Sequence, residues 1–198
     1  MAMKTKDGSF VLSPSDLTAS AGCEFGWLRS VDIRWGRTKA VEVEPDAMME
    51  RAADLGDIHE ARELARLKAA GLTVVEIERP KPYTSETLAA AQDKTLEALK
   101  SGADVVFQAT FFDGGFGGMS DFIRLEPDGT YAVWDAKLAR SAKVTALLQI
   151  AAYADQLDRL QIPRSPIGHL LLGNGEDSVH NLDEIMPVYF ERRAKLER

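Results

Sequence analysis

Cysteine is nearly absent from this chain, since Cys23 is the only one among 198 residues. A disulfide within the chain is therefore excluded, which agrees with a reducing compartment. The sequence also lacks any apolar run long enough to cross a bilayer, and its first ten residues, MAMKTKDGSF, lack the apolar stretch of a secretory signal. We therefore expect a cytoplasmic protein.

An excess of positive charge is missing as well. The chain has 24 Lys and Arg residues against 31 Asp and Glu residues, which gives a net charge of -7. This balance argues against binding of nucleic acid through a broadly basic surface and would suit an enzyme for small phosphorylated molecules. Basic residues do cluster locally, in RSVDIRWGRTK (29–39) and KLARSAK (137–143). Each cluster is either a solvated face or a contact for phosphates.

The composition, 45% hydrophobic and 8% aromatic, suits one compact domain with a substantial core over residues 1–198. Apolar periodicity and turn residues predict helices over about residues 14–27, 45–70, 85–101 and 143–160 and from residue 182. Strands are predicted at 72–78, 104–113, 118–126, 130–138 and 167–173, with a flexible glycine-rich tip at 114–118. This order predicts an α/β fold. The last segment, YFERRAKLER, has no capping glycine, so we expect a fragment of a longer protein.

The most informative segment is the hairpin predicted around the turn EPDG. Alternation along the second strand places Asp135 and Lys137 on one face, and Trp134 and Ala136 on the other. If the hairpin pairs in register, Asp121 approaches Asp135, and two carboxylates beside a lysine are what metal-assisted phosphodiester cleavage needs. The alternative is a surface ion pair that stabilises little. The apolar run AVWDAKLA favours the first interpretation, because charges embedded in such a strand need a partner, commonly a metal.

Four short motifs in order resemble those of the PD-(D/E)XK nuclease superfamily. They are Asp121, the D-x-K of Asp135 to Lys137, the Q-x-x-x-Y of Gln149 to Tyr153, and the upstream G-x-x-H of Gly56 to His59. The last two point to the RecB-like branch. More narrowly, VLSPSDL, GDIHEAR, QATFFDG and WDAKLAR resemble the RecB-like nuclease module at the N-terminus of large bacterial proteins that carry a helicase region. The similarity spans nearly the whole chain.

The resemblance implies a restriction-endonuclease-like core, with a central mixed sheet flanked by helices, and a Mg²⁺- or Mn²⁺-dependent deoxyribonuclease. The expected activity is that of an exonuclease in DNA repair, recombination or processing. By resemblance, the cation is held by His59, Asp121, Asp135 and the backbone carbonyl of Ala136. The implied catalytic residues are Asp121, Asp135, Lys137, Gln149 and Tyr153. Gln149 would orient the lysine or the scissile phosphate, and Tyr153 would contact the DNA or buttress the site.

The expected partner is single- or double-stranded DNA, contacted by Arg140, Lys143, Gln149 and Tyr153, with a helicase region in the same full-length chain. Some RecB-like nucleases bind an iron-sulfur cluster through four cysteines, and Cys23 alone excludes one here. Related modules often carry a polar residue where this chain has Met119. Glu60, next to His59, is expected to face another direction.

Two alternatives stay open. A single histidine on a helix, such as His59, is more often a satisfied, half-buried residue than a ligand. The whole domain could also be a catalytically weak nuclease fold that serves as a DNA-binding or docking module of a helicase protein.

Overall fold

The computed structural model describes residues 3–4, 10–41, 44 and 46–198. Its strands are β1 (Met3–Lys4), β2 (Phe10–Val11), β3 (Val74–Glu76), β4 (Val105–Phe112), β5 (Gly117–Leu125), β6 (Tyr131–Lys137), β7 (Arg164–Leu172) and β8 (Asp177–Asn181). Its helices are α1 (Pro14–Gly22), α2 (Glu24–Arg34), α3 (Ala47–Ala69), α4 (Ser85–Lys100), α5 (Val144–Arg159) and α6 (Leu182–Leu196). The predicted start of α3, at Pro45, lies outside the described residues.

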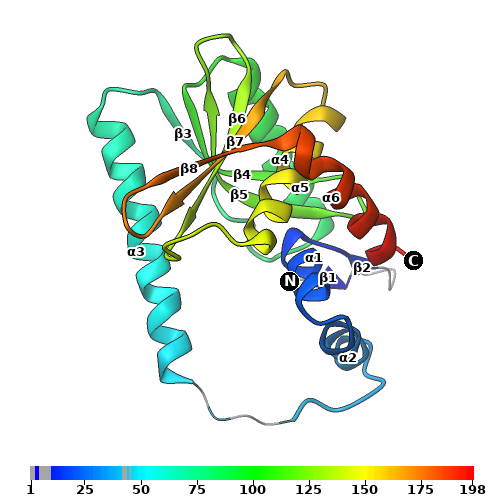
Figure 1. Ribbon diagram of the computed structural model, residues 1–198. Coiled ribbons are helices and arrows are strands. Elements are labelled where there is room, and N and C mark those ends of the chain that lie inside the picture. Colours follow the sequence, from blue (N-terminus) through cyan, green and yellow to red (C-terminus); the bar gives the residue numbers. More distant parts are fainter. Residues whose placement is uncertain (1–2, 5–9, 42–43, 45) are drawn as a thin grey trace.

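A mixed sheet of six strands forms the centre of the molecule, in the order β3-β4-β5-β6-β7-β8. The pairs β3–β4 and β6–β7 are parallel, whereas β4–β5, β5–β6 and β7–β8 are antiparallel. Helices lie on both faces, which confirms the predicted α/β class (Figure 1). The predicted hairpin is present as β5 and β6.

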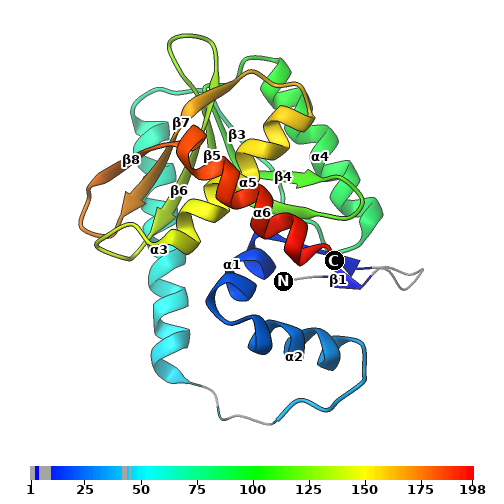
Figure 2. The ribbon, with the colours of Figure 1, turned by 45° about the vertical axis from the view of Figure 1, so that its right-hand side comes forward.

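The two faces of the sheet bury very different amounts of apolar surface. The α3 helix covers one face, where Leu67 packs with Phe122 and Trp134 in a small cluster. The α1, α4, α5 and α6 helices cover the other face over the main core, which includes Ile123 and Ile150 (Figure 2). Val133 belongs to the main core and Trp134 to the small cluster, so the predicted alternation along β6 is confirmed.

The α5 helix is buried on nearly all sides. Tyr153 is 3% exposed and Gln156 is 2% exposed. Tyr153 faces the sheet, where its ring packs against Phe111 and its hydroxyl bonds to the backbone of β5, while α1 and α6 also pack against α5. Two of the polar residues on α5 are therefore held in the interior, where each needs a specific partner.

The N-terminal region differs from the single predicted helix through Trp27. The chain breaks at Cys23, whose backbone is extended (φ -155°, ψ 100°). Its Sγ accepts the N–H of Gly26 at 3.3 Å and so caps the start of α2. Sulfur is a weak acceptor and cysteine is not a usual N-cap residue, which is why the sequence did not reveal this break.

The glycine-rich segment is only in part the predicted flexible tip. Gly114 lies in the turn with φ +91°, but Gly117 and Gly118 belong to β5 and are buried. A Cβ atom on Gly118 would lie 2.9 Å from Cδ of Pro14 and 3.2 Å from the hydroxyl oxygen of Tyr153. Gly118 is therefore required by close packing rather than by a turn.

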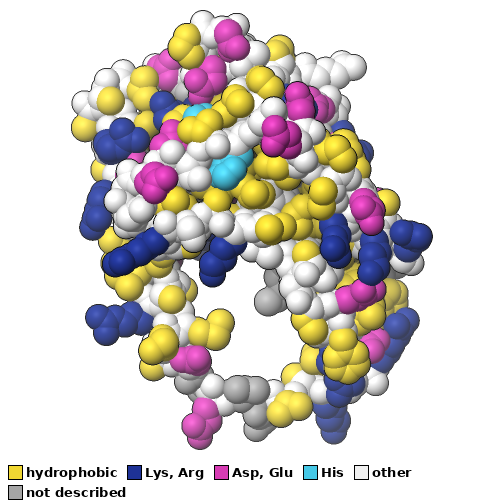
Figure 3. All heavy atoms as spheres, viewed as in Figure 1, with side chains coloured by type: hydrophobic (Ala, Val, Ile, Leu, Met, Phe, Trp, Pro, Cys, Tyr) yellow, Lys and Arg dark blue, Asp and Glu magenta, His cyan; other side chains and the backbone are white. Residues whose placement is uncertain are grey.

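The N-terminal half of α3 extends past the sheet (Figures 1 and 2). Hydrophobic side chains lie on this projecting part in the space-filling view (Figure 3), and Met48 is 80% exposed, Met49 71% and Ile58 53%. Within the described residues, no helix combines the length and apolarity that a membrane span would need.

Candidate functional site

Three polar side chains form a row across the middle of the sheet. The β5–β6 register runs from Phe122 opposite Trp134 to Leu125 opposite Tyr131, and its continuation places Asp121 opposite Asp135. The β4–β5 register skips one pair, which places Gln108 opposite Asp121. Gln108, Asp121 and Asp135 therefore lie side by side on β4, β5 and β6.

The backbone of Gln108 is strained inside its strand. Its φ angle is +54°, a left-handed conformation that costs a residue other than glycine about 1–3 kcal/mol. Gln161 has a similar φ of +56°, but it follows the C-terminus of α5, where this conformation commonly ends a helix. A left-handed glutamine within a strand is much less usual, and strain of this kind clusters at functional sites.

Asp135 is completely buried, with 0% exposure. Nζ of Lys137 lies 2.5 Å from its Oδ2, yet neither carboxylate oxygen has a partner in hydrogen-bond geometry among the described residues. Burial and, next, the nearby charge of Asp121 raise the pKa of Asp135, and Lys137 only partly offsets them. The site thus has too little positive charge for its carboxylates.

Lys137 stays charged in these surroundings. Burial by itself lowers its pKa, but Asp135 and Asp121 outweigh that effect, so the pKa of Lys137 is raised above its usual value. Its side chain is 30% exposed and therefore connects the buried carboxylates with solvent.

Asp121 is bonded to the backbone of β6. Its Oδ2 accepts the N–H of Ala136 at 2.8 Å. In an extended strand, the N–H and C=O of one residue point to the same side, so the carbonyl of Ala136 is directed toward Asp121 as well. The three oxygen donors predicted from the hairpin (Asp121, Asp135 and the Ala136 carbonyl) thus come from neighbouring positions.

Glu60 joins this group from α3. Gln108 donates its Nε2–H to Oε1 of Glu60, and Arg79 donates to Oε1 of Gln108 at 3.2 Å. Burial, with a further contribution from Asp121, raises the pKa of Glu60 to about 7. The expectation that Glu60 faces away from the site is wrong.

His59 is directed elsewhere. Its Nε2 lies 3.1 Å from the carbonyl oxygen of Leu171, and its ring lines a separate groove together with Trp134. Helical spacing explains the difference. Glu60 is four residues before Leu64 and seven before Leu67, which pack on the sheet, whereas His59 shares its face with Glu63 and Arg66. The same spacing, applied to the sequence, is the signal that would have found Glu60.

Tyr153 supports the site from behind. Its hydroxyl donates to the carbonyl of Met119 at 2.5 Å, two residues before Asp121. Burial, followed by the charges of Asp135 and Asp121, raises the pKa of Tyr153 well above its usual value. Because Tyr153 is 3% exposed, a buttressing role fits the structure and direct contact with DNA does not.

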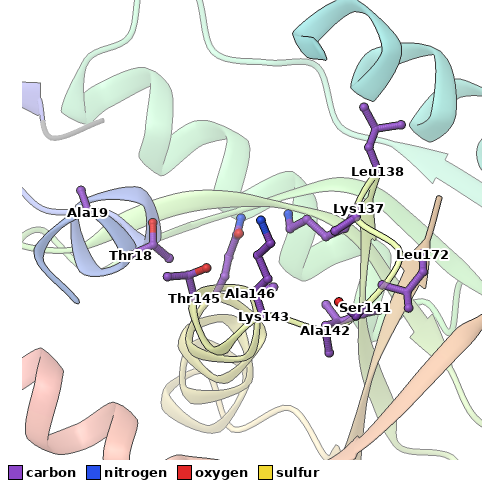
Figure 4. Close-up of a pocket in the computed structure, with 13 residues that line it drawn as sticks. Thr18, Ala19, Lys137, Leu138, Ser141, Ala142, Lys143, Thr145, Ala146 and Leu172 are labelled. Atoms are coloured by element: carbon purple, nitrogen blue, oxygen red, sulfur yellow. The ribbon is translucent and has the colours of Figure 1, made fainter. Parts of the chain in front are cut away.

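A cavity of about 360 Å³ opens beside Lys137. Lys143 and Gln149 also line it, and the amino ends of Lys137 and Lys143 project into the same space (Figure 4). Arg140 is exposed on the connecting segment and is not among the residues that line this cavity. Of the four residues predicted to contact DNA, the structure therefore brings Lys143 and Gln149 together.

The carboxylates of Asp121 and Asp135 suit a divalent cation that takes few ligands from the protein. No group of three His, Cys, Asp or Glu side chains in the described part of the chain is arranged to hold a metal, so His59 does not complete such a group. Mg²⁺ nevertheless commonly binds through one or two carboxylates, together with water and substrate phosphates. The unpartnered oxygens of Asp135 and the adjacent Asp121 meet that requirement.

Comparison with known proteins does not assign this chain to a family. No protein-family model matches the chain. No curated protein is significantly similar to it. The class that the structure establishes is an α/β protein with a mixed sheet, and any function has to be argued from the site.

Proposed function

We propose that this protein is a Mg²⁺- or Mn²⁺-dependent nuclease of the RecB-like branch of the PD-(D/E)XK superfamily that hydrolyses phosphodiester bonds of DNA. The observation that carries the proposal is the buried carboxylate of Asp135, which among the described residues has an ion pair with Lys137 but no partner in hydrogen-bond geometry, and which lies next to Asp121. Burying two neighbouring carboxylates with only one lysine is costly, which favours a bound cation.

The order of elements supports the same proposal. A helix (α4), three strands (β4–β6), a second helix (α5) and a further strand (β7) follow one another in the chain. The helices and strands predicted from the sequence over residues 85–173 come in this same order, which is compatible with the central mixed sheet flanked by helices that the resemblance implies. The strained Gln108, the two aspartates and Lys137 all lie in its three central strands.

Asp121, Asp135 and the carbonyl of Ala136 would hold the cation. When bound, a divalent cation supplies a Lewis acid that polarises a phosphate oxygen and lowers the pKa of bound water. Lys137 orients the attacking water or stabilises the negative charge that grows on the phosphorane, as a mobile point charge can.

The remaining residues position this chemistry. Glu60 suits the acceptance of a proton, because its pKa of about 7 is close to neutral pH. Gln149 faces the cavity, where it can orient Lys137 or the phosphate, and Tyr153 fixes the backbone that leads to Asp121.

A second candidate is a DNA-binding or docking module without catalytic activity, in the same full-length chain as a helicase region. The observation in its favour is that no third protein ligand joins Asp121 and Asp135 as a metal-holding group within the described residues. Such a module would bind DNA and leave it intact.

Two variants test the proposal. Titration calorimetry with Mn²⁺, followed by incubation with labelled single- and double-stranded DNA, should show both cation binding and cleavage for the wild type. We expect Lys137→Ala to bind Mn²⁺ and lose cleavage, whereas Asp135→Ala loses both.

Lys100→Ala changes an exposed lysine at the end of α4 and serves as the matched control. Equal Mn²⁺ affinity in the wild type and Asp135→Ala would contradict the ligand assignment. DNA binding without cleavage by the wild type would favour the docking module. Circular single-stranded DNA then separates the activities, because an exonuclease leaves it intact.

A further inference from the structure

A basic pocket lies between the segment that follows β3 and the α4 helix, and it shares no lining residue with the cavity at Lys137. Its lining contains three cations, Arg79, Lys81 and Lys94, but only one acid, Glu78. The chain as a whole has a net charge of -7, so this local surplus of positive charge runs against the composition. A pocket with such a surplus attracts an anion, and one with two negative charges matches it best.

The groove beside His59 shows that arginines alone do not make such a pocket. Acids outnumber arginines in that groove, whose charged lining consists of Arg66, Arg124, Glu63, Glu176 and Asp177. Arg66 also forms an ion pair with Glu63 at 2.8 Å. The basic pocket differs, because there the cations outnumber the acid.

The cations of the basic pocket are available to a ligand. Arg79, Lys81 and Lys94 are exposed, and none of them forms a salt bridge with a carboxylate in the described part of the chain. The acid at the end of the neighbouring strand, Glu76, is paired with Lys68 at 2.6 Å instead. An anion from solvent therefore does not have to displace a carboxylate of the protein.

Arg79 is held in place from the side of the candidate site. Its Nε donates to Oε1 of Gln108 at 3.2 Å, whereas its two terminal nitrogens have no hydrogen-bond partner among the residues that the structure describes. A guanidinium fixed at one nitrogen loses less freedom when the others bind an anion. Gln108 in turn donates to Glu60, so Arg79 connects the basic pocket with the row of polar residues across the sheet.

The size of the basic pocket limits the ligand. Its volume is about 210 Å³, below the roughly 300 Å³ at which pockets for small organic ligands begin. Pro80, Ala90 and Ala91 form apolar wall, and the hydroxyl of Thr87 already donates to backbone carbonyls just before α4. The guanidinium and ammonium groups remain as donors. A phosphate group fits, because near neutral pH it has up to about two negative charges and three oxygens that accept from Arg and Lys.

We propose that the basic pocket binds a phosphate dianion, either inorganic phosphate or the terminal phosphate of a nucleotide, and that Arg79 connects the occupied pocket with Gln108. A phosphodiester of the DNA backbone has a single negative charge and is a poorer match for this surplus of positive charge. Binding at this pocket needs neither cleavage nor a divalent cation, so it is independent of the proposed nuclease function.

Titration of the ¹⁵N-labelled protein with inorganic phosphate, followed by NMR at constant ionic strength and about pH 7.5, tests the pocket. We expect saturable shifts of backbone amides between residues 78 and 94, and none on titration with chloride. Lys94→Ala should weaken phosphate binding about three- to tenfold, and Glu78→Gln should strengthen it by a similar factor, because it removes the acid of the lining. Lys100→Ala changes an exposed lysine of the same helix outside the pocket and should bind phosphate as the wild type does.

Three ligands identify the chemistry that the pocket accepts. Deoxythymidine 5′-monophosphate should bind about as tightly as inorganic phosphate, because the pocket is too small for the nucleoside. Binding at least about tenfold tighter would identify a nucleotide as the source of the phosphate group. Dimethyl phosphate, a diester with one negative charge, should bind at least about tenfold more weakly than inorganic phosphate. Equal affinity for the diester would overturn the assignment to a dianion and indicate a contact with the DNA backbone.

The connection with Gln108 has a readout of its own. The side-chain amide signals of Gln108, identified by their loss in Gln108→Gly, should shift with the same saturation as the backbone amides of the pocket. Unmoved signals would overturn the connection. Shifts that do not saturate with phosphate, or equal affinities of the wild type, Lys94→Ala and Glu78→Gln, would overturn the pocket itself. Neither failure affects the Mn²⁺ titration of Asp135→Ala, which tests the nuclease proposal separately.

Discussion

Two buried aspartates on opposite sides of the main core have opposite surroundings. Asp155, on α5, is 5% exposed, and its Oδ2 accepts hydrogen bonds from Arg193 at 2.7 Å, Arg159 at 2.8 Å and Tyr189 at 2.8 Å. Asp135 is 0% exposed, and among the described residues neither of its oxygens has a partner in hydrogen-bond geometry, although Nζ of Lys137 lies 2.5 Å from Oδ2. Both side chains are buried, but three donors compensate the charge of Asp155, whereas Lys137 compensates that of Asp135 only in part.

The difference separates a structural cluster from a candidate active site. Arg193 also donates to Oδ2 of Asp113 at 2.9 Å, so the first cluster ties α6 to α5 and to the turn between β4 and β5. Every member of that cluster has a partner, which makes it a source of rigidity. The Asp135 group lacks this closure, because its raised pKa shows that Lys137 offsets its burial and the nearby charge of Asp121 only in part.

The largest effect on stability is expected at the structural cluster. Arg193→Met leaves Asp155 and Asp113 without their main partner, and removal of one member of a buried ion pair costs about 3–5 kcal/mol. Urea unfolding should show a loss of this size. Arg192→Met, at the exposed neighbouring position, is the control and should change little. A loss below about 1 kcal/mol at Arg193 would mean that this cluster is no better satisfied than the one at Asp135.

At the candidate site, we expect a substitution to increase the stability of the protein. Asp135→Asn removes a buried carboxylate that Lys137 compensates only in part, so without divalent cations it should raise the free energy of unfolding by about 1–2 kcal/mol. The gain should disappear when Mn²⁺ is added, because the cation stabilises only the wild type. Asp155→Asn, the matched change in the satisfied cluster, should be destabilising. Destabilisation by both variants would remove the contrast between the two aspartates.

A smaller effect should appear as a pH dependence of stability. Glu60 has a folded-state pKa of about 7, above its ordinary 4.5, so the folded protein holds the extra proton between these values. Stability without divalent cations should therefore fall as the pH rises from about 4.5 to about 7, by roughly 1 kcal/mol after allowance for solvent screening. Unfolding measured across this range should show the slope, and Glu60→Gln should reduce it. Stability that rises with pH there in both proteins would contradict the assignment.

The smallest change in stability is expected at Gln108. Gln108→Gly relieves the left-handed backbone but removes the bond to Glu60, so the net change should stay within about 1 kcal/mol. The pKa of Glu60 should then rise further, because the hydrogen bond from Gln108 lowers it. Gln161→Gly relieves a similar φ at a helix end and should simply stabilise by about 0.5–1 kcal/mol. An unchanged pH profile in Gln108→Gly would show that Gln108 does not act on Glu60.

Much of the fold follows from local sequence patterns. The structure contains the helix predicted from the apolar spacing of α3 and the hairpin predicted from the turn residues between β5 and β6. Val133 and Trp134 lie on opposite faces of β6, as the alternation predicted. The β8 strand was missed, because DSVHN is a short, polar edge strand whose pairing with β7 depends on a partner far from any local pattern.

The candidate site was predictable only in part. Asp121, Asp135 and Lys137 could be placed together because one tight hairpin sets their register. Glu60 and Gln108 could not, since they reach the row from a separate helix and from a backbone conformation that propensity disfavours in a strand. The burial of Tyr153 was also hidden, because it depends on how α5 packs against β4 and β5.

Gly118 is a position at which related sequences can be compared. The hydroxyl of Tyr153 reaches the carbonyl of Met119 only because residue 118 of the strand has no side chain. Pro14 also packs closely against this position. A descendant that keeps both aspartates and the lysine but gains even a methyl group at residue 118 would have to shift the strand that carries Asp121. Glycine at this position should therefore distinguish sequences with an intact geometry at the candidate site from those that retain only the motif.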